Sequence, residues 1–180
     1  LYNSGPDAAD LGNYTFKFCS NACTNNEFES TRDFCEVWDD ANSDGDYDSS
    51  ETCTQTPVLQ PGETWVVCDK GAGDGLLALC DQPITLSHNG NDAQGLFLGD
   101  TLIDVIGDAS NYEYWDVGST GSTKDKSLVR KPEITDGTTD WNASAGTTDE
   151  NSQWIVGVKP EDNVTPDTVG THTCDLPGDG

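Results

Sequence analysis

The sequence predicts an all-β protein folded as a β-sandwich. Helical periodicity is nearly absent from its 180 residues, and short alternating or apolar runs recur between Gly, Asn, Asp and Pro instead. About nine such runs occur in a chain whose length suits one domain or at most two small ones. Many short strands that share one compact core are typical of a sandwich.

The strands are expected at intervals along the whole chain. Residues 14–18 and 34–38 alternate aromatic and polar side chains, as half-buried strands do. Pro61 and Gly62 stand where a β-turn favours them, and this turn leads into a buried strand. The buried strand covers residues 64–68, and further strands are expected at 76–79, 84–86, 94–98, 101–106, 127–130 and 154–158.

A hairpin is expected around Gly99 and Asp100. A two-residue loop with Gly first is the pattern of a type II′ turn, so the runs on either side of it are expected to pair antiparallel. For the chain as a whole, the expected divisions are residues 1–158 for the sandwich, 20–56 for a loop-rich insertion within it and 159–180 for a C-terminal tail or linker.

The composition is strongly acidic but still typical of a folded protein. The net charge is −25, yet aromatic residues make up 8% and include five tryptophans, which is too many for a disordered acidic tail. Nucleic acid and anionic membrane surfaces are not expected as partners at this net charge, because both attract clustered Lys and Arg. No apolar run approaches the ~20 residues of a membrane span, so membrane insertion is not expected. The negative net charge favours cations as ligands, above all calcium.

The cysteines predict disulfides and therefore an extracellular or cell-surface protein. A zinc site is the alternative, but Cys19 and Cys23 lack the tightest metal-binding spacing and the two histidines are far apart in the sequence. The sequence leaves the pairing open. The absence of an initial Met or signal peptide suggests an excised piece of a longer secreted protein. The odd number of cysteines fits this interpretation, because one disulfide partner would then lie outside the piece or on another chain. The candidate disulfide residues are Cys19, Cys23, Cys35, Cys53, Cys68, Cys80 and Cys174.

Three sequons are candidate N-glycosylation sites. They begin at Asn13, Asn142 and Asn163, and they are acceptors if the protein is secreted from a eukaryotic cell. A chain rich in Asn, Ser and Thr also produces such triplets by chance.

Residues 40–51 match the EF-hand calcium-loop pattern at every defined position. Calcium prefers six to eight hard oxygen ligands, and this spacing wraps them around one point, with Gly45 where the chain must turn sharply. The predicted ligands are Asp40, Asn42, Asp44, Asp46 through its carbonyl, Asp48 through water, and Glu51 as a bidentate carboxylate.

The alternative interpretation of this segment is a solvated acidic loop. A chain with 33 acidic residues matches such a pattern more easily, and the flanking residues do not look helical. EF-like loops without both helices do occur in extracellular modules. Cys35 and Cys53 bracket the loop, and a disulfide between them would hold its ends together.

No catalytic motif stands out. A phosphate-binding Gly-rich loop, a Gly-x-Ser-x-Gly elbow and a His-Glu-x-x-His sequence are all missing. His88 beside an Asn is open to a nuclease interpretation, but a structural role is favoured because no second His is near it in the sequence. The basic cluster Lys124, Lys126, Arg130 and Lys131 could bind acidic glycans, although an exposed strand that balances nearby acids is the simpler interpretation. The tryptophans are expected in the core, with Trp115 the one most expected on the surface.

Several motifs follow one another in residues 1–5 with 10–16, 59–67, 89–107 and 122–131. Their order resembles the lamin-tail domain, in particular the versions found in secreted bacterial and algal proteins. The resemblance implies an immunoglobulin-like β-sandwich and a non-catalytic module. The strand that begins the family's fold is missing here, and an unfilled sheet edge can accept a strand donated by another molecule.

We therefore expect a non-catalytic, calcium-stabilised structural or adhesive module of a surface or matrix protein, with a self-assembling fibre subunit as one form of it. Its expected partners are further copies of itself or neighbouring extracellular proteins, with glycans as an additional class. The alternative is an accessory domain that targets a secreted hydrolase, such as a nuclease, to its substrate. Further copies of this module in the full chain would favour the first hypothesis, and a catalytic domain the second.

Overall fold

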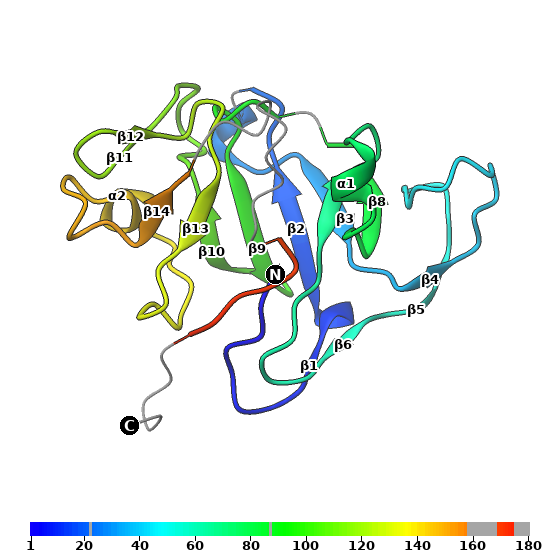
Figure 1. The fold of residues 1–180 in the computed structure, drawn as a ribbon. Helices are drawn as coiled ribbons and strands as arrows, with labels where there is room; N and C mark the ends of the chain where they lie inside the picture. Colours follow the sequence, from blue (N-terminus) through cyan, green and yellow to red (C-terminus); the bar gives the residue numbers. More distant parts are fainter. Residues whose placement is uncertain (22, 87, 158–168, 175–180) are drawn as a thin grey trace.

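The computed structural model describes residues 1–21, 23–86, 88–157 and 169–174. Figure 1 shows its short strands around a central sheet. The helices are α1 (Asp74–Leu77) and α2 (Trp141–Ala145), with 3-10 turns at η1 (Leu11–Asn13) and η2 (Thr24–Asn26). The strands are β1 (Ala9–Asp10), β2 (Tyr14–Phe18), β3 (Ser30–Asp33), β4 (Val37–Trp38), β5 (Cys53–Gln55), β6 (Val58–Leu59), β7 (Val67–Asp69), β8 (Gln82–Ile84), β9 (Gln94–Leu98), β10 (Thr101–Ile106), β11 (Asp116–Val117), β12 (Gly121–Ser122), β13 (Leu128–Arg130) and β14 (Trp154–Val156).

The largest sheet has four antiparallel strands in the order β10-β9-β2-β3. The hairpin predicted between β9 and β10 is confirmed: Leu98 pairs with Thr101, and Gly99 between them has a φ of 56°. Only glycine adopts this conformation without steric cost, which is why the Gly-first loop predicted the turn well. The strand at residues 14–18 is confirmed as β2.

The all-β class is confirmed, because strands make up 29% of the described residues and helices 9%. Outside the central sheet, the described strands form separate two-stranded sheets: β1 with β6, β4 with β5, β11 with β12, and β13 with β14 are antiparallel, and β7 with β8 is parallel. The sandwich arrangement therefore stays a prediction. The predicted tail 159–180 lies outside the described residues except for 169–174.

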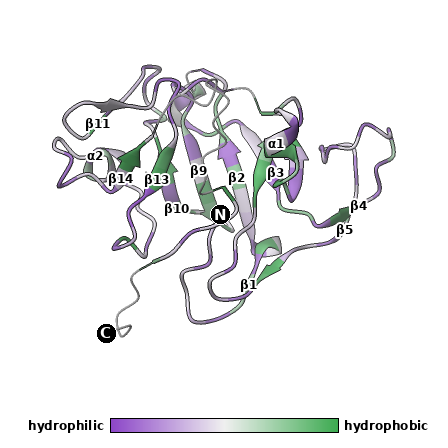
Figure 2. Cartoon of the chain, viewed as in Figure 1, coloured by the Kyte–Doolittle hydropathy of each residue, from purple (hydrophilic) through white to green (hydrophobic). Residues whose placement is uncertain are grey.

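Buried side chains form three hydrophobic clusters, and the tryptophans supply much of their bulk. The first contains Trp115, Trp141 and Trp154, the second contains Trp65, and the third joins Cys35, Tyr47 and Ile84. In Figure 2 the hydrophobic colour lies mainly on the strands, whereas the loops are mostly hydrophilic. Aromatic burial compensates for the low aliphatic content, since each ring removes a large apolar area from water.

The strand predicted at residues 76–79 is wrong, because this segment forms α1 and the turn after it. The amide of Leu77 donates to the carbonyl of Gly73 at 3.1 Å, and the amide of Ala78 donates to that of Asp74 at 3.0 Å. A short apolar run does not distinguish a strand from one helical turn. The turn also brings Cys80 back to form a disulfide with Cys68.

The strand predicted at residues 34–38 is also too long, since only Val37 and Trp38 belong to β4. Cys35 is fully buried, and its amide donates to the side-chain Oε1 of Gln82 at 3.2 Å instead of to a neighbouring strand. A buried amide needs a partner, and here a glutamine side chain supplies it. Alternation alone could not predict this partner, because Gln82 is distant in the sequence.

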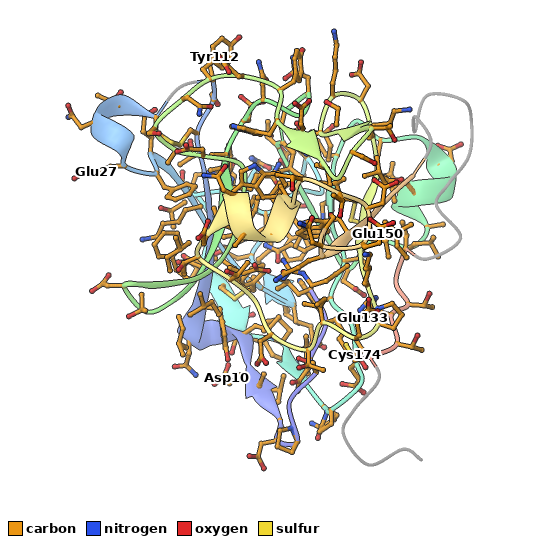
Figure 3. The ribbon with its side chains drawn as sticks, turned by 90° about the vertical axis from the view of Figure 1, so that its left-hand side faces the viewer. Asp10, Glu27, Tyr112, Glu133, Glu150 and Cys174 are labelled. Carbon is orange, nitrogen blue, oxygen red and sulfur yellow. A yellow bond between two sulfur atoms is a disulfide. The ribbon has the colours of Figure 1, made fainter. Side chains whose placement is uncertain are left out.

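Trp115 is buried at 9% exposure, so the expectation that it lies on the surface is wrong. Its ring packs edge-to-face on Trp141 at 6.2 Å, and its indole nitrogen donates to Asn111 Oδ1 at 2.9 Å. The exposed aromatics of this region are Tyr112 and Tyr114 instead. Figure 3 shows Tyr112 projecting from the molecule.

We expect Gly107→Ala to destabilise the protein by about 2–4 kcal/mol. Gly107 has a φ of 82°, and a Cβ there would collide with the Trp115 ring. Gly62→Ala is the matched control, because Gly62 has a φ of 84° with no heavy atom within 4 Å of an added Cβ. Urea denaturation measures both variants. Equal losses of stability would show that the Trp115 contact contributes nothing beyond backbone strain.

Candidate metal centre

The acidic loop is held at both ends by β4 and β5. Trp38 pairs with Cys53, and the amide of Asp39 donates to the carbonyl of Thr52 at 3.1 Å. A disulfide between Cys35 and Cys53, with the Cα atoms 5.7 Å apart, joins the same two ends. The expected bracketing disulfide is thus present. In Figure 1 the loop extends from these strands away from the central sheet.

In the first half of the loop, side-chain oxygens accept hydrogen bonds from backbone amides. The amide of Asp44 lies 3.1 Å from Asp40 Oδ1 and 3.0 Å from Asn42 Oδ1. Gly45 follows with a φ of 78°, so the chain turns where the EF-hand pattern places its glycine. The amide of Asp46 then donates to Asp44 Oδ1 at 3.2 Å.

Three carboxylates converge on one point. One oxygen from each of Asp40, Asp44 and Glu51 lies within 4.8 Å of the others. These residues hold positions 1, 5 and 12 of the predicted loop, so residues from its two ends meet. Asp40 and Asp44 are exposed to solvent, whereas Glu51 is buried.

Glu51 is the least satisfied member of this group. Its side chain is 8% exposed, and within the described structure the buried Oε1 has no hydrogen-bond partner. Its other oxygen, Oε2, accepts from the amide of Asp48 at 3.3 Å. Burial, followed by the charges of Asp48, Asp40 and Asp44, raises the pKa of Glu51 above the usual value. A buried carboxylate oxygen without a donor is unfavourable unless a cation approaches it.

The other predicted ligands lie differently. Asp48 is not in the converging group, and its Oδ1 accepts from the amide and hydroxyl of Ser50, both at 2.6 Å, which lowers its pKa. The carboxylate of Asp46 is outside the group as well, which is compatible with the expected use of its carbonyl alone. The Oδ1 of Asn42 accepts from the backbone amide of Asp44, and Asp40 Oδ1 accepts from the same amide.

The carboxylate of Asp46 contacts a lysine that the sequence pattern did not predict. Asp46 is 1% exposed, and its Oδ2 lies 2.9 Å from the ammonium of Lys70. The same ammonium lies 3.4 Å from Asp44 Oδ2. These contacts, first with Asp46 and then with Asp44, raise the pKa of Lys70, so it carries a positive charge at neutral pH. Lys70 follows β7, and no sequence spacing connects it with the acidic loop.

Tyr47 links the loop to the core. It occupies position 8 of the predicted loop, is 8% exposed and packs on Trp38 with the ring centroids 5.9 Å apart. Its amide donates to the carbonyl of Pro83 at 3.1 Å, which fixes this part of the loop beside β8. Because the backbone at Tyr47 is held in place, its neighbours, the buried Asp46 and the half-buried Asp48, have defined positions.

The remaining predicted sites are dispersed. Asn13 in η1 and Asn142 in α2 are exposed, as glycan acceptors must be, and Asn163 lies outside the described residues. Besides the disulfides already named, Cys19 pairs with Cys23, which removes that pair from consideration as zinc ligands. Cys174 belongs to none of the three bridges, and its Sγ lies 3.8 Å from the carbonyl of Ile134.

The basic cluster is not one exposed patch. Arg130 is turned inward: its NH2 group lies 2.9 Å and 3.0 Å from the two oxygens of Asp104, and its guanidinium stacks 4.3 Å from the Trp154 ring centre. Lys131 donates to the carbonyl of Asp149 at 2.6 Å. Arg130 therefore joins β13 to β10 and is unavailable as a ligand-binding cation.

Acidic residues outside the loop are spread over the surface, as Asp10 and Glu27 illustrate in Figure 3. His88 is exposed. Among the described residues, the converging carboxylates of the loop are therefore the strongest candidate site.

Comparisons with known proteins give no match, whether with protein-family models, curated proteins or solved structures. Among the described residues, no helix is both long enough and apolar enough to cross a membrane. Three disulfides are typical of proteins from an oxidising compartment. The function proposed below therefore rests on the geometry of the described residues.

Proposed function

We propose that this protein is a non-catalytic, secreted structural or adhesive module whose loop at residues 40–51 binds calcium. One observation carries the calcium assignment: the buried Oε1 of Glu51 has no partner among the described residues and belongs to a group that converges with Asp40 and Asp44. A divalent cation is the partner that satisfies this oxygen and neutralises the carboxylates together.

The ligand set favours calcium over other metals. The converging atoms are all carboxylate oxygens, whereas zinc prefers nitrogen and sulfur ligands. Magnesium demands near-ideal octahedral geometry and retains its water, while calcium accepts flexible sites with irregular spacing. Two of the three carboxylates are exposed, so the ion enters directly from solvent and keeps water ligands at its open side.

Calcium binding would stabilise the module in a particular way. The ion would join the start of the loop at Asp40 to its end at Glu51, next to the disulfide that already closes it. It would also offset the mutual repulsion of the loop carboxylates. The effect is structural: calcium would fix the loop at the side of the core, as it does in many extracellular modules.

The disulfides, the net charge and the family resemblance support the secreted, structural part of the proposal. The disulfides fit an oxidising compartment, and the charge of −25 keeps a protein soluble at high local concentration. The lamin-tail resemblance supports a non-catalytic module, with self-association by strand donation as its extension. Exposed Asn13 and Asn142 fit glycosylation of such a protein.

Calorimetry on the chelator-treated protein tests the calcium proposal. We expect one calcium ion to bind with a dissociation constant in the range of about 0.1–1 mM, the range of extracellular modules, and to raise the melting temperature. Magnesium at equal concentration is the control and should bind more weakly. If about 10 mM calcium produced neither a heat of binding nor a rise in melting temperature, the proposal would be overturned. Sedimentation of the same samples shows whether calcium also promotes self-association.

A further inference from the structure

The candidate calcium loop contains a positively charged side chain from a distant part of the sequence. Lys70 reaches the loop from the turn after β7, where its amide donates to the carbonyl of Ile84 at 2.9 Å. The disulfide between Cys68 and Cys80 holds the same segment. The backbone of Lys70 is therefore fixed beside the loop, while its side chain, 43% exposed, retains freedom to move.

The ammonium of Lys70 lies between a buried and an exposed carboxylate. It is 2.9 Å from Asp46 Oδ2 and 3.4 Å from Asp44 Oδ2. Asp46 does not belong to the converging ligand group, whereas Asp44 is one of its three members. The Asp44 carboxylate would therefore contact two cations, the ammonium of Lys70 and the proposed metal ion.

We propose that Lys70 is a built-in counter-ion that competes with calcium for Asp44 and so sets the affinity of the loop. This inference rests on the proposed calcium site. Without calcium, the ammonium partly neutralises Asp44 and Asp46 and permits the acidic loop to remain compact. When calcium is bound, the Asp44 carboxylate coordinates the metal, and Lys70 keeps its contact with Asp46 alone.

Elementary electrostatics gives the direction of this effect. A like charge within one side-chain length of a metal ion opposes its binding, and the opposition is reduced by solvent because the ammonium is partly exposed. Removing the charge of Lys70 also leaves the carboxylates less neutralised in the metal-free state. Both contributions make calcium binding more favourable in a variant without the charge.

Calcium titrations of four variants test the proposal. Lys70→Met removes both charge and donor, and Lys70→Gln removes the charge but keeps a donor for Asp46. We expect both to bind calcium about tenfold more tightly than the wild type at low salt. Lys70→Arg keeps the charge and should stay within about threefold. Lys126→Met makes the same change in net charge at an exposed lysine outside the loop and should stay within about twofold.

The outcomes separate this inference from the calcium site itself. If the wild type binds calcium and neither Lys70→Gln nor Lys70→Met binds it more tightly, the counter-ion role is overturned and the site stands. If Lys126→Met tightens binding as much as Lys70→Met, net charge explains the effect and the inference is overturned. If no variant binds calcium, both proposals fail. Near-UV circular dichroism in chelator confirms that each variant is folded, and Lys70→Gln preserves the test if Lys70→Met is not.

Discussion

Replacing Glu51 by Gln is expected to reduce calcium affinity by about 100-fold. The substitution keeps the shape of the side chain but removes its charge and its ability to bind a cation through two equivalent oxygens. Glu51 is the buried member of the ligand group, and its Oε1 has no partner among the described residues. Titration calorimetry with calcium measures the loss directly.

The same variant is expected to be more stable than the wild type when calcium is absent. Burial and nearby carboxylates raise the folded-state pKa of Glu51 above its value in the unfolded chain. The native protein therefore binds a proton more readily than the unfolded one, and its stability falls as the pH rises through the interval between the two pKa values. Glutamine has no such penalty. Above that interval, Glu51→Gln should raise the melting temperature in chelator.

Two effects of opposite sign distinguish a metal ligand from a residue that only supports the loop. A purely structural glutamate would lose stability on substitution both with and without calcium. Glu113→Gln is the matched control, because Glu113 is exposed and lies outside the loop, and it should change neither quantity. A Glu51→Gln variant that binds calcium as tightly as the wild type would remove Glu51 from the proposed site.

The local chemistry of turns explains which parts of the fold were predictable. The hairpin at Gly99 was predictable because a positive φ selects glycine within a two-residue loop. The segment at 76–79 was not, because a short apolar run fits a strand and one helical turn equally well, and no local pattern specifies the disulfide from Cys80 to Cys68 that follows it. Trp115 likewise lies in a polar stretch, and its burial follows from packing against Trp141, which is distant in the sequence.

The candidate site also has a part that local sequence spacing predicts and a part that depends on contacts with a distant segment. The EF-hand spacing predicted that Asp40, Asp44 and Glu51 converge, because positions within one loop are fixed by its own turns. It gave no indication that the buried carboxylate of Asp46 pairs with Lys70. Lys70 belongs to another part of the chain, and it lies beside the loop because β7 pairs with β8, where Pro83 accepts from the amide of Tyr47. Contacts between segments that are distant in the sequence leave no periodic signal.

Removing the disulfide at the base of the loop is expected to have a large effect on stability. The double variant Cys35→Ser, Cys53→Ser opens a bridge with a sequence separation of 18. Loop-closure entropy of that length corresponds to about 3 kcal/mol, equivalent to about 6–12 °C in melting temperature for a chain of this size. Urea denaturation in chelator measures this loss.

Calcium reveals whether this disulfide does more than restrict the unfolded chain. The double variant Cys68→Ser, Cys80→Ser opens a bridge with a separation of 12, for which the same entropy model gives a similar loss of about 3 kcal/mol. If the bridge at Cys35 positions the loop ends, calcium should stabilise its variant less than it stabilises this control, because Asp40 and Glu51 must then be brought together at the expense of binding. Equal stabilisation by calcium in both variants would show that pairing of β4 with β5 is sufficient to preorganise the loop.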